Sequence, residues 1–156
     1  MGIDKRALTQ SVASKTILLL DTSAVIAYLD GGESVSPVSA HIIDSWVRTG
    51  RNTAVVSTIT VMEVLVKPVK HQVGLAQARD FLTRFPNLVP QVVDMDVATR
   101  AAFLRAQYAF KPPDSLIIAT GIAHGATALV TNDAQCSQKL ASLQPGMSVL
   151  RLSDFT

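Results

Sequence analysis

Residues 16–32, TILLLDTSAVIAYLDGG, decide the fold class. Ile17 to Leu20 are four consecutive apolar residues, which is typical of a strand buried on both faces of a parallel sheet. This predicted strand stops at Asp21, and the residues after it favour a short helix that ends at Gly31-Gly32. A buried strand that leads directly into a helix is the repeating unit of α/β domains.

The same alternation of strands and helices continues along the chain. Further strands are predicted at 53–59, 88–92, 126–133 and 147–152. Helices are predicted at 37–48, from Thr60 to a break at Pro68, at 71–85, at 96–109 with Asp96 as the cap, and at 114–125. We therefore expect an α/β three-layer sandwich with a central parallel sheet of about five strands. Residues 16–156 are expected to form one domain, and residues 1–15 a poorly ordered arm or an extension of the first strand.

Composition narrows the class of protein. The chain has 156 residues, of which 48% are hydrophobic and 17% charged, so it can bury one sizeable core. The single cysteine, Cys136, argues against a disulfide framework and a Cys-based zinc site. No apolar stretch approaches the roughly 20 residues that span a bilayer, and the N-terminus lacks the apolar region of a secretory signal. We expect a cytoplasmic protein that makes no membrane contact.

Four carboxylates stand where predicted strands or loops meet helices: Asp21, Glu63, Asp114 and Asp133. In parallel α/β sheets, ligands bind outside the carboxyl ends of the strands. Clustered carboxylates repel one another and are costly to bury unless they share cations. Oxygen-rich sites of this kind suit Mg²⁺ or Mn²⁺. The four acids therefore predict a divalent-metal site for cutting phosphodiester bonds.

Each acid also has a purely structural explanation. Asp21 and Asp114 are good helix caps, and Thr60 with Glu63 has the spacing of a capping box. Asp133 suits a turn. From the residues alone, both roles stay open for each position.

Four segments carry a family resemblance: ILLLDTSAVIAYLDG, VVSTITVMEVL, PDSLIIATGIAHG and ALVTND. In order and spacing they resemble the PIN-domain family, and in particular VapC-like toxin ribonucleases, across about residues 16–152. The resemblance implies metal-binding carboxylates at Asp21, Glu63 and Asp114, and it aligns the family's T-x-D ending with Thr131 and Asp133. Ser23 resembles a hydroxyl that lies beside the metal ligands.

The resemblance also implies a function. It predicts an endoribonuclease that depends on Mg²⁺, or alternatively Mn²⁺, and that acts as the toxin of a toxin–antitoxin pair. The implied partners are an RNA substrate, a small cognate antitoxin protein and a second copy of the chain. The sequence departs from some relatives at Cys136 and Ser137, where a further acid stands after the T-x-D.

Two other functions fit parts of the pattern. A catalytically silent PIN-like module would bind RNA or protein without cutting, although retention of all four acids argues against it. A haloacid-dehalogenase-type phosphatase would place its nucleophilic Asp at the same strand end, but it would want a second Asp where this chain has Ser23. The basic residues between Pro68 and Asn87 are interpreted as a solvated helix face, with RNA or antitoxin contact as the alternative; they are Lys70, His71, Arg79 and Arg84.

Overall fold

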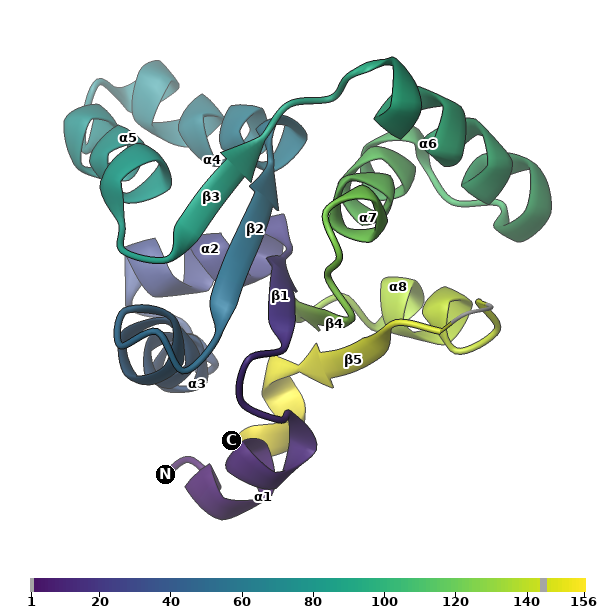
Figure 1. Ribbon diagram of the computed structural model, residues 1–156. Helices are drawn as coiled ribbons and strands as arrows, with labels where there is room; N and C mark the ends of the chain where they lie inside the picture. Colours follow the sequence, from purple (N-terminus) through teal and green to yellow (C-terminus); the bar gives the residue numbers. More distant parts are fainter. Residues whose placement is uncertain (1, 144–145) are drawn as a thin grey trace.

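A five-stranded parallel sheet forms the centre of the protein (Figure 1). The computed structural model describes residues 2–143 and 146–156. The strands lie in the order β3-β2-β1-β4-β5, so β1 is in the middle with β2 and β4 on either side. Their bounds are β1 Ile17–Leu20, β2 Thr53–Ser57, β3 Leu88–Gln91, β4 Ala128–Thr131 and β5 Ser148–Arg151. The predicted parallel α/β sandwich is confirmed.

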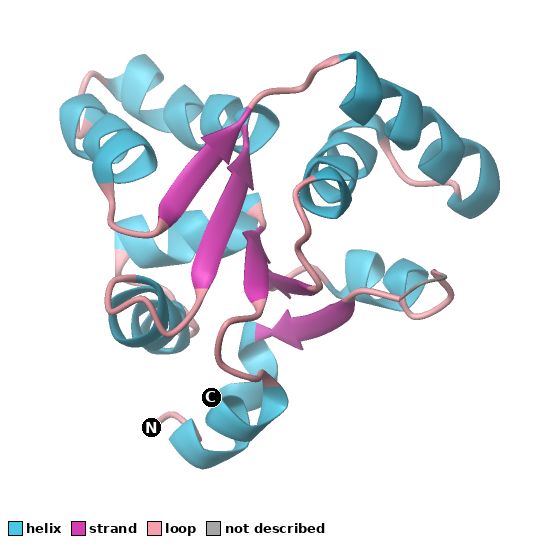
Figure 2. Cartoon of the chain, viewed as in Figure 1, coloured by secondary structure: helices cyan, strands magenta, loops and turns pink. Residues whose placement is uncertain are grey.

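Helices cover both faces of this sheet (Figure 2). They are α1 Lys5–Ser11, α2 Thr22–Asp30, α3 Ser36–Ala40, η1 His41–Val47, α4 Thr58–His71, α5 Leu75–Arg84, α6 Met95–Tyr108, α7 Pro112–Ala123, α8 Ala134–Leu140 and η2 Leu152–Phe155. One apolar core lies under α1 to α5, and a second lies under α6, α7 and α8. Among the described residues, no helix has both the length and the apolar character needed to cross a bilayer.

The central strand β1 divides its side chains between the two cores. Leu18 and Leu20 belong to the first core and Leu19 to the second, as expected from the two-residue period of a strand. Helix α7 approaches the second face closely at Gly121, where an added Cβ would lie 2.6 Å from Leu19 Cδ2. The glycine thus allows the helix that carries Asp114 to pack directly on β1.

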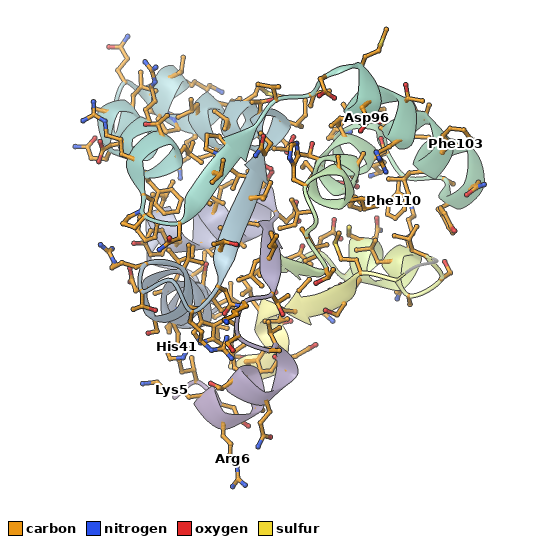
Figure 3. All side chains as sticks on the ribbon, in the orientation of Figure 1. Lys5, Arg6, His41, Asp96, Phe103 and Phe110 are labelled. Atoms are coloured by element: carbon orange, nitrogen blue, oxygen red, sulfur yellow. The ribbon has the colours of Figure 1, made fainter. Side chains whose placement is uncertain are left out.

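The structure of the N-terminal segment differs from what the sequence predicted. Residues 5–11 form helix α1 instead of a disordered arm or a strand extension, and Leu8 is fully buried. Arg51 donates to the carbonyl of Val12 at 2.7 Å, and the buried Asn52 amide donates to the carbonyls of Ala13 and Thr16 at 3.0 and 2.9 Å. These long-range bonds fix the segment, while Lys5 and Arg6 project outward from α1 (Figure 3).

Several predicted helix boundaries also differ. The segment predicted as one helix at 37–48 consists of α3 and a π-helix, η1, in which the Arg48 amide bonds to the carbonyl of Ile43 at 2.9 Å. Helix α4 begins after Ser57, which caps it, and it continues past the predicted break at Pro68 to His71, although proline lacks the backbone N–H that an interior helix position would donate. Asp94 caps α6, so Asp96 is free to pair with Arg100 at 2.9 Å.

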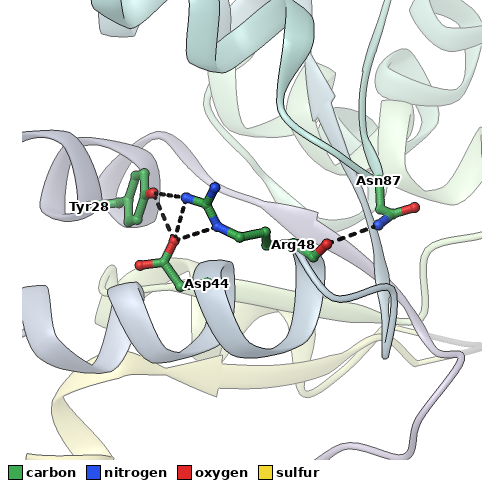
Figure 4. Close-up of polar contacts among 4 residues, drawn as sticks. All are labelled: Tyr28, Asp44, Arg48 and Asn87. Atoms are coloured by element: carbon green, nitrogen blue, oxygen red, sulfur yellow. Dashed lines mark hydrogen bonds and ion pairs between the residues drawn. The ribbon is translucent and has the colours of Figure 1, made fainter.

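A polar network outside the first core ties α2 to η1 (Figure 4). The Tyr28 hydroxyl donates to Asp44 at 3.0 Å, and Arg48 pairs with the same carboxylate at 2.9 Å. Asn87 donates to the carbonyl of Arg48 at 3.4 Å. The network therefore anchors α2, the helix that directly follows Asp21.

Candidate active site

The predicted site lies at the ends of the neighbouring strands β1 and β4. The connections that follow these two strands run toward opposite edges of the sheet. The chain continues from β1 to β2 and β3 on one side, whereas β4 leads to β5 on the other side. Asp21 directly follows β1, and Asp133 lies two residues after the neighbouring strand β4. This topological switch point is the usual place of ligand sites in open α/β sheets.

Asp21 is the most buried of the four acids, with 9% of its surface exposed. It caps α2, because its Oδ1 accepts from the backbone amide of Thr22 at 2.9 Å. Its Oδ2 accepts from the Thr131 hydroxyl at 2.6 Å and from the Ser23 hydroxyl at 3.3 Å. The capping role suggested by the sequence and a place in the site therefore coexist in one side chain.

Thr131 connects Asp21 to Asp133. Its hydroxyl, which donates to Asp21, accepts from the backbone amide of Asp133 at 2.9 Å. Ser23 accepts in turn from the backbone amide of Asn132 at 2.9 Å, so it fixes the same loop. The Asp133 carboxylate caps α8 by accepting from the amides of Gln135 and Cys136. Both hydroxyls predicted beside the site thus touch Asp21.

Glu63 reaches the site from α4. Because Ser57 caps this helix, Thr60 and Glu63 form no capping box, and the structural explanation for Glu63 is wrong. Its Oε1 accepts from the Thr22 hydroxyl at 2.7 Å, one residue from Asp21. Thr22 was not predicted to lie in the site, although its position directly after Asp21, in the first turn of a predicted helix, was a signal for it.

Asp114 completes the set from α7. Lys111 occupies the cap position of this helix and Asp114 its first turn, so Asp114 is not the cap. Burial raises the pKa of its carboxyl above the ordinary value, and the nearby charges of Asp21, Asp133 and Glu63 raise it further, whereas Lys111 lowers it. Asp114 therefore lies within electrostatic range of the other three acids.

The pKa of Asp21 is raised as well. Burial is the largest cause, and the charge of Asp133 adds to it; the hydrogen bonds from Thr131, the Thr22 backbone and Ser23 act in the opposite direction. None of the ion pairs found within residues 2–143 and 146–156 involves any of the four acids. The structure thus gathers negative charge at a partly buried point and supplies no salt bridge to balance it.

The oxygen atoms of these side chains are of the chemical type that binds a hard divalent cation. Carboxylate and hydroxyl oxygens are the ligands that Mg²⁺ and Mn²⁺ prefer. Across the described part of the chain, however, no three Asp, Glu, His or Cys side chains converge tightly enough to form a metal-binding cluster as they stand. The acids are therefore neighbours with suitable chemistry, and metal binding would have to draw them closer together.

Cys136 lies beside the acids but is a poor nucleophile. Burial, followed by the charges of Asp21, Asp114 and Asp133, raises the pKa of its thiol to about 12. The reactive form of a cysteine is the thiolate. At neutral pH this thiol stays protonated, so it acts as a packing residue in the second core.

The fold and the acidic rim define an α/β protein with a carboxylate site at a sheet switch point. The PIN domain family's sequence model matches residues 18–140, and the chain belongs to this family of nucleases. No curated protein sequence matches the chain significantly.

Several solved structures share the fold. A toxin–antitoxin complex from Klebsiella pneumoniae is 25% identical, with a TM-score of 0.64 over 88% of this chain and 98% of that one. VapBC2 from Rickettsia felis, bound to promoter DNA, is 19% identical, with a TM-score of 0.62 over 86% and 98%. VapC20 from Mycobacterium tuberculosis is 13% identical, with a TM-score of 0.58 over 73% and 87%.

Proposed function

We propose that this protein is a divalent-metal-dependent endoribonuclease that acts as the toxin of a toxin–antitoxin pair. The observation that carries the proposal is that four acids from four elements lie within electrostatic range of one another at the carboxyl ends of β1 and β4, without a salt bridge to any of them among the described residues. Membership of a nuclease family supports the reaction class. A fold shared with VapC20, a toxin that cleaves the sarcin–ricin loop, supports the choice of RNA.

Asp21, Asp114, Glu63 and Asp133 would hold one or two Mg²⁺ or Mn²⁺ ions. When bound, such an ion lowers the pKa of water and neutralises charge on the phosphoryl oxygens. Thr131 and Ser23 orient Asp21, and Thr22 orients Glu63, so three hydroxyls hold two of the acids in place. Hydrolysis adds water across a P–O bond of the RNA, and the leaving oxygen takes up a proton.

Neither Ser23 nor Cys136 is suited to act as the nucleophile. Ser23 is bonded to Asp21 and to the amide of Asn132, and within the described residues no histidine makes a hydrogen bond to it. The raised pKa of Cys136 keeps its thiol protonated. Because the proposal assigns the four acids to the metal, water is the attacking group.

Metal-dependent cleavage tests this proposal. Purified protein would be incubated with labelled total RNA in Mg²⁺, in Mn²⁺ and in excess chelator, and the products separated by gel electrophoresis. We expect cleavage with either metal and none with chelator. Binding without cleavage in any buffer would favour the silent PIN-like module, and release of phosphate from a small phosphomonoester would favour the phosphatase.

The toxin role requires a partner. Relatives with this fold have been solved as toxin–antitoxin complexes, including the one from Klebsiella pneumoniae. We expect a small cognate antitoxin, encoded by a short reading frame beside this gene, and a homodimer in the cytoplasm. Light scattering of the purified chain, alone and with the protein product of the neighbouring reading frame, measures both assemblies. A monomer that does not bind that product contradicts the expectation.

A further inference from the structure

Helix α4 carries three charged or polar side chains at four-residue intervals: Glu63, Lys67 and His71. Residues four apart lie on the same face of a helix. All three line one groove of about 410 Å³, whose other lining residues come from α2, the beginning of α5 and the loop between α4 and α5. The groove therefore starts at an acid of the candidate active site and continues along α4 away from it.

The groove is lined mainly by apolar side chains, here called its floor, and its charged residues belong to two helices, here called its α4 and α2 walls. The apolar side chains come from all three helices; they include Ile26, Leu29, Val64, Pro68 and Ala78. On the α4 wall stand Lys67 and His71, whereas Asp30 lies on the α2 wall. The volume is within the range of small-molecule sites, which are mostly apolar with a few polar groups that fix orientation.

Lys67 is exposed, and none of the ion pairs within residues 2–143 and 146–156 includes it. Its ammonium group is thus available for an external anion. Glu63, one turn earlier, already bonds to Thr22 and belongs to the acidic site. An anion bound at Lys67 would lie one helical turn from that acidic site.

We propose that this groove binds the nucleotide next to the bond that is cut. Lys67 and His71 contact its phosphate, and its base lies on the apolar floor. The charges set this orientation, because Asp30 repels a phosphate from the α2 wall and can accept a hydrogen bond from an amino group at the base edge. The inference rests on the proposed ribonuclease function, and it names the residues that position the substrate.

Position favours RNA over a protein segment as the occupant, with Lys67 as the cationic contact. An apolar floor alone would suit either. Lys67 and His71, however, share their wall with Glu63, so the groove is continuous with the site where a polyanion would be cut. Binding of a protein segment in the groove is one of the outcomes that the test below distinguishes.

The test measures the affinity for a short fluorescein-labelled, single-stranded RNA of mixed sequence, in chelator so that cleavage does not occur. Lys67→Gln is compared with Lys70→Gln, a matched control on the same helix that does not line the groove. We expect Lys67→Gln to raise Kd about fivefold and to reduce the slope of log Kd against log salt by about 0.7, the value for one lost phosphate contact on a single strand. Ile26→Asn should weaken binding without changing the slope.

The outcomes separate the groove from the nuclease. Equal effects of Lys67→Gln and Lys70→Gln, or no RNA binding by the wild-type chain, overturn the groove inference. If metal-dependent cleavage persists with the same KM in both lysine variants, the ribonuclease stands and the groove falls. If Lys67→Gln weakens RNA binding but no metal supports cleavage, the groove stands only as an RNA-binding site, and the proposed ribonuclease function falls. Weakened binding of the neighbouring gene's protein product, with RNA affinity unchanged, assigns the groove to a protein.

Discussion

Replacing Thr131 by Val removes the hydroxyl that joins the two strand-end acids while keeping the shape of the side chain. The hydroxyl is fully buried, donates to Asp21 at 2.6 Å and accepts from the Asp133 amide at 2.9 Å. A hydrogen bond to a charged group contributes about 1.5–3 kcal/mol, and an amide left without its partner adds to the loss. We expect Thr131→Val to lower the free energy of unfolding by about 3 kcal/mol.

Thr131→Ser is the matched control, because it keeps the hydroxyl and loses only a buried methyl group, at a cost of about 1 kcal/mol. Urea unfolding followed by circular dichroism, in chelator, measures both variants. For a chain of this size, the differences correspond to falls in Tm of about 6–12 °C for Val and about 2–4 °C for Ser. Equal stability of the two variants would refute the role assigned to the hydroxyl.

Three further predictions concern the packing, the N-terminus and pH. Gly121→Ala should cost about 1–3 kcal/mol in urea unfolding, because the new Cβ meets Leu19 at 2.6 Å; unchanged stability would contradict this close approach. Asn52→Ala should speed amide hydrogen exchange in α1 selectively, since two bonds to the segment after α1 are lost; exchange that stays slow would show that α1 is held by other contacts. Burial raises the pKa of Asp21 and Asp114 above 3.8, so the metal-free folded state holds these protons more tightly than the unfolded chain. Their contribution to stability is therefore largest below about pH 4 and falls as pH rises through the raised pKa values. The Tm difference between the wild type and an Asp21→Asn, Asp114→Asn double variant, measured across this range in chelator, checks the sign; a constant difference would contradict it.

The sheet and most of its helices were predictable from local patterns. The apolar run Ile17 to Leu20 and the segment around Leu129 are short and apolar, which is typical of buried strands, and the acids after them follow from chain order. Helix α1 was missed because its segment has no long apolar face, although Asp4, which caps the helix, was a local signal for its start. It is held by Arg51 and Asn52, which lie about 40 residues away in the sequence.

Helix starts were harder to predict where two capping residues compete. Ser57 and Thr60 both suit the start of α4, and Asp94 and Asp96 both suit the start of α6. In each case the earlier residue is the cap, since its extended backbone places its side chain against the first free amides. This outcome matters for the site, because it leaves Glu63 free to bond to Thr22.

The rate of RNA cleavage by Asp21→Asn, relative to wild type in saturating Mn²⁺, tests the central claim most directly. Asp80→Asn is the control, since Asp80 is exposed on α5 and its one side-chain partner in the described part of the chain is Arg84, in a long ion pair at 3.7 Å. If Asp21 holds the catalytic ion, we expect a loss of about 1000-fold, or about 4 kcal/mol of transition-state stabilisation. The Asp80→Asn variant should cleave at the wild-type rate. Cleavage by a folded Asp21→Asn protein at the rate of Asp80→Asn would contradict the assignment of this acidic rim as the active site.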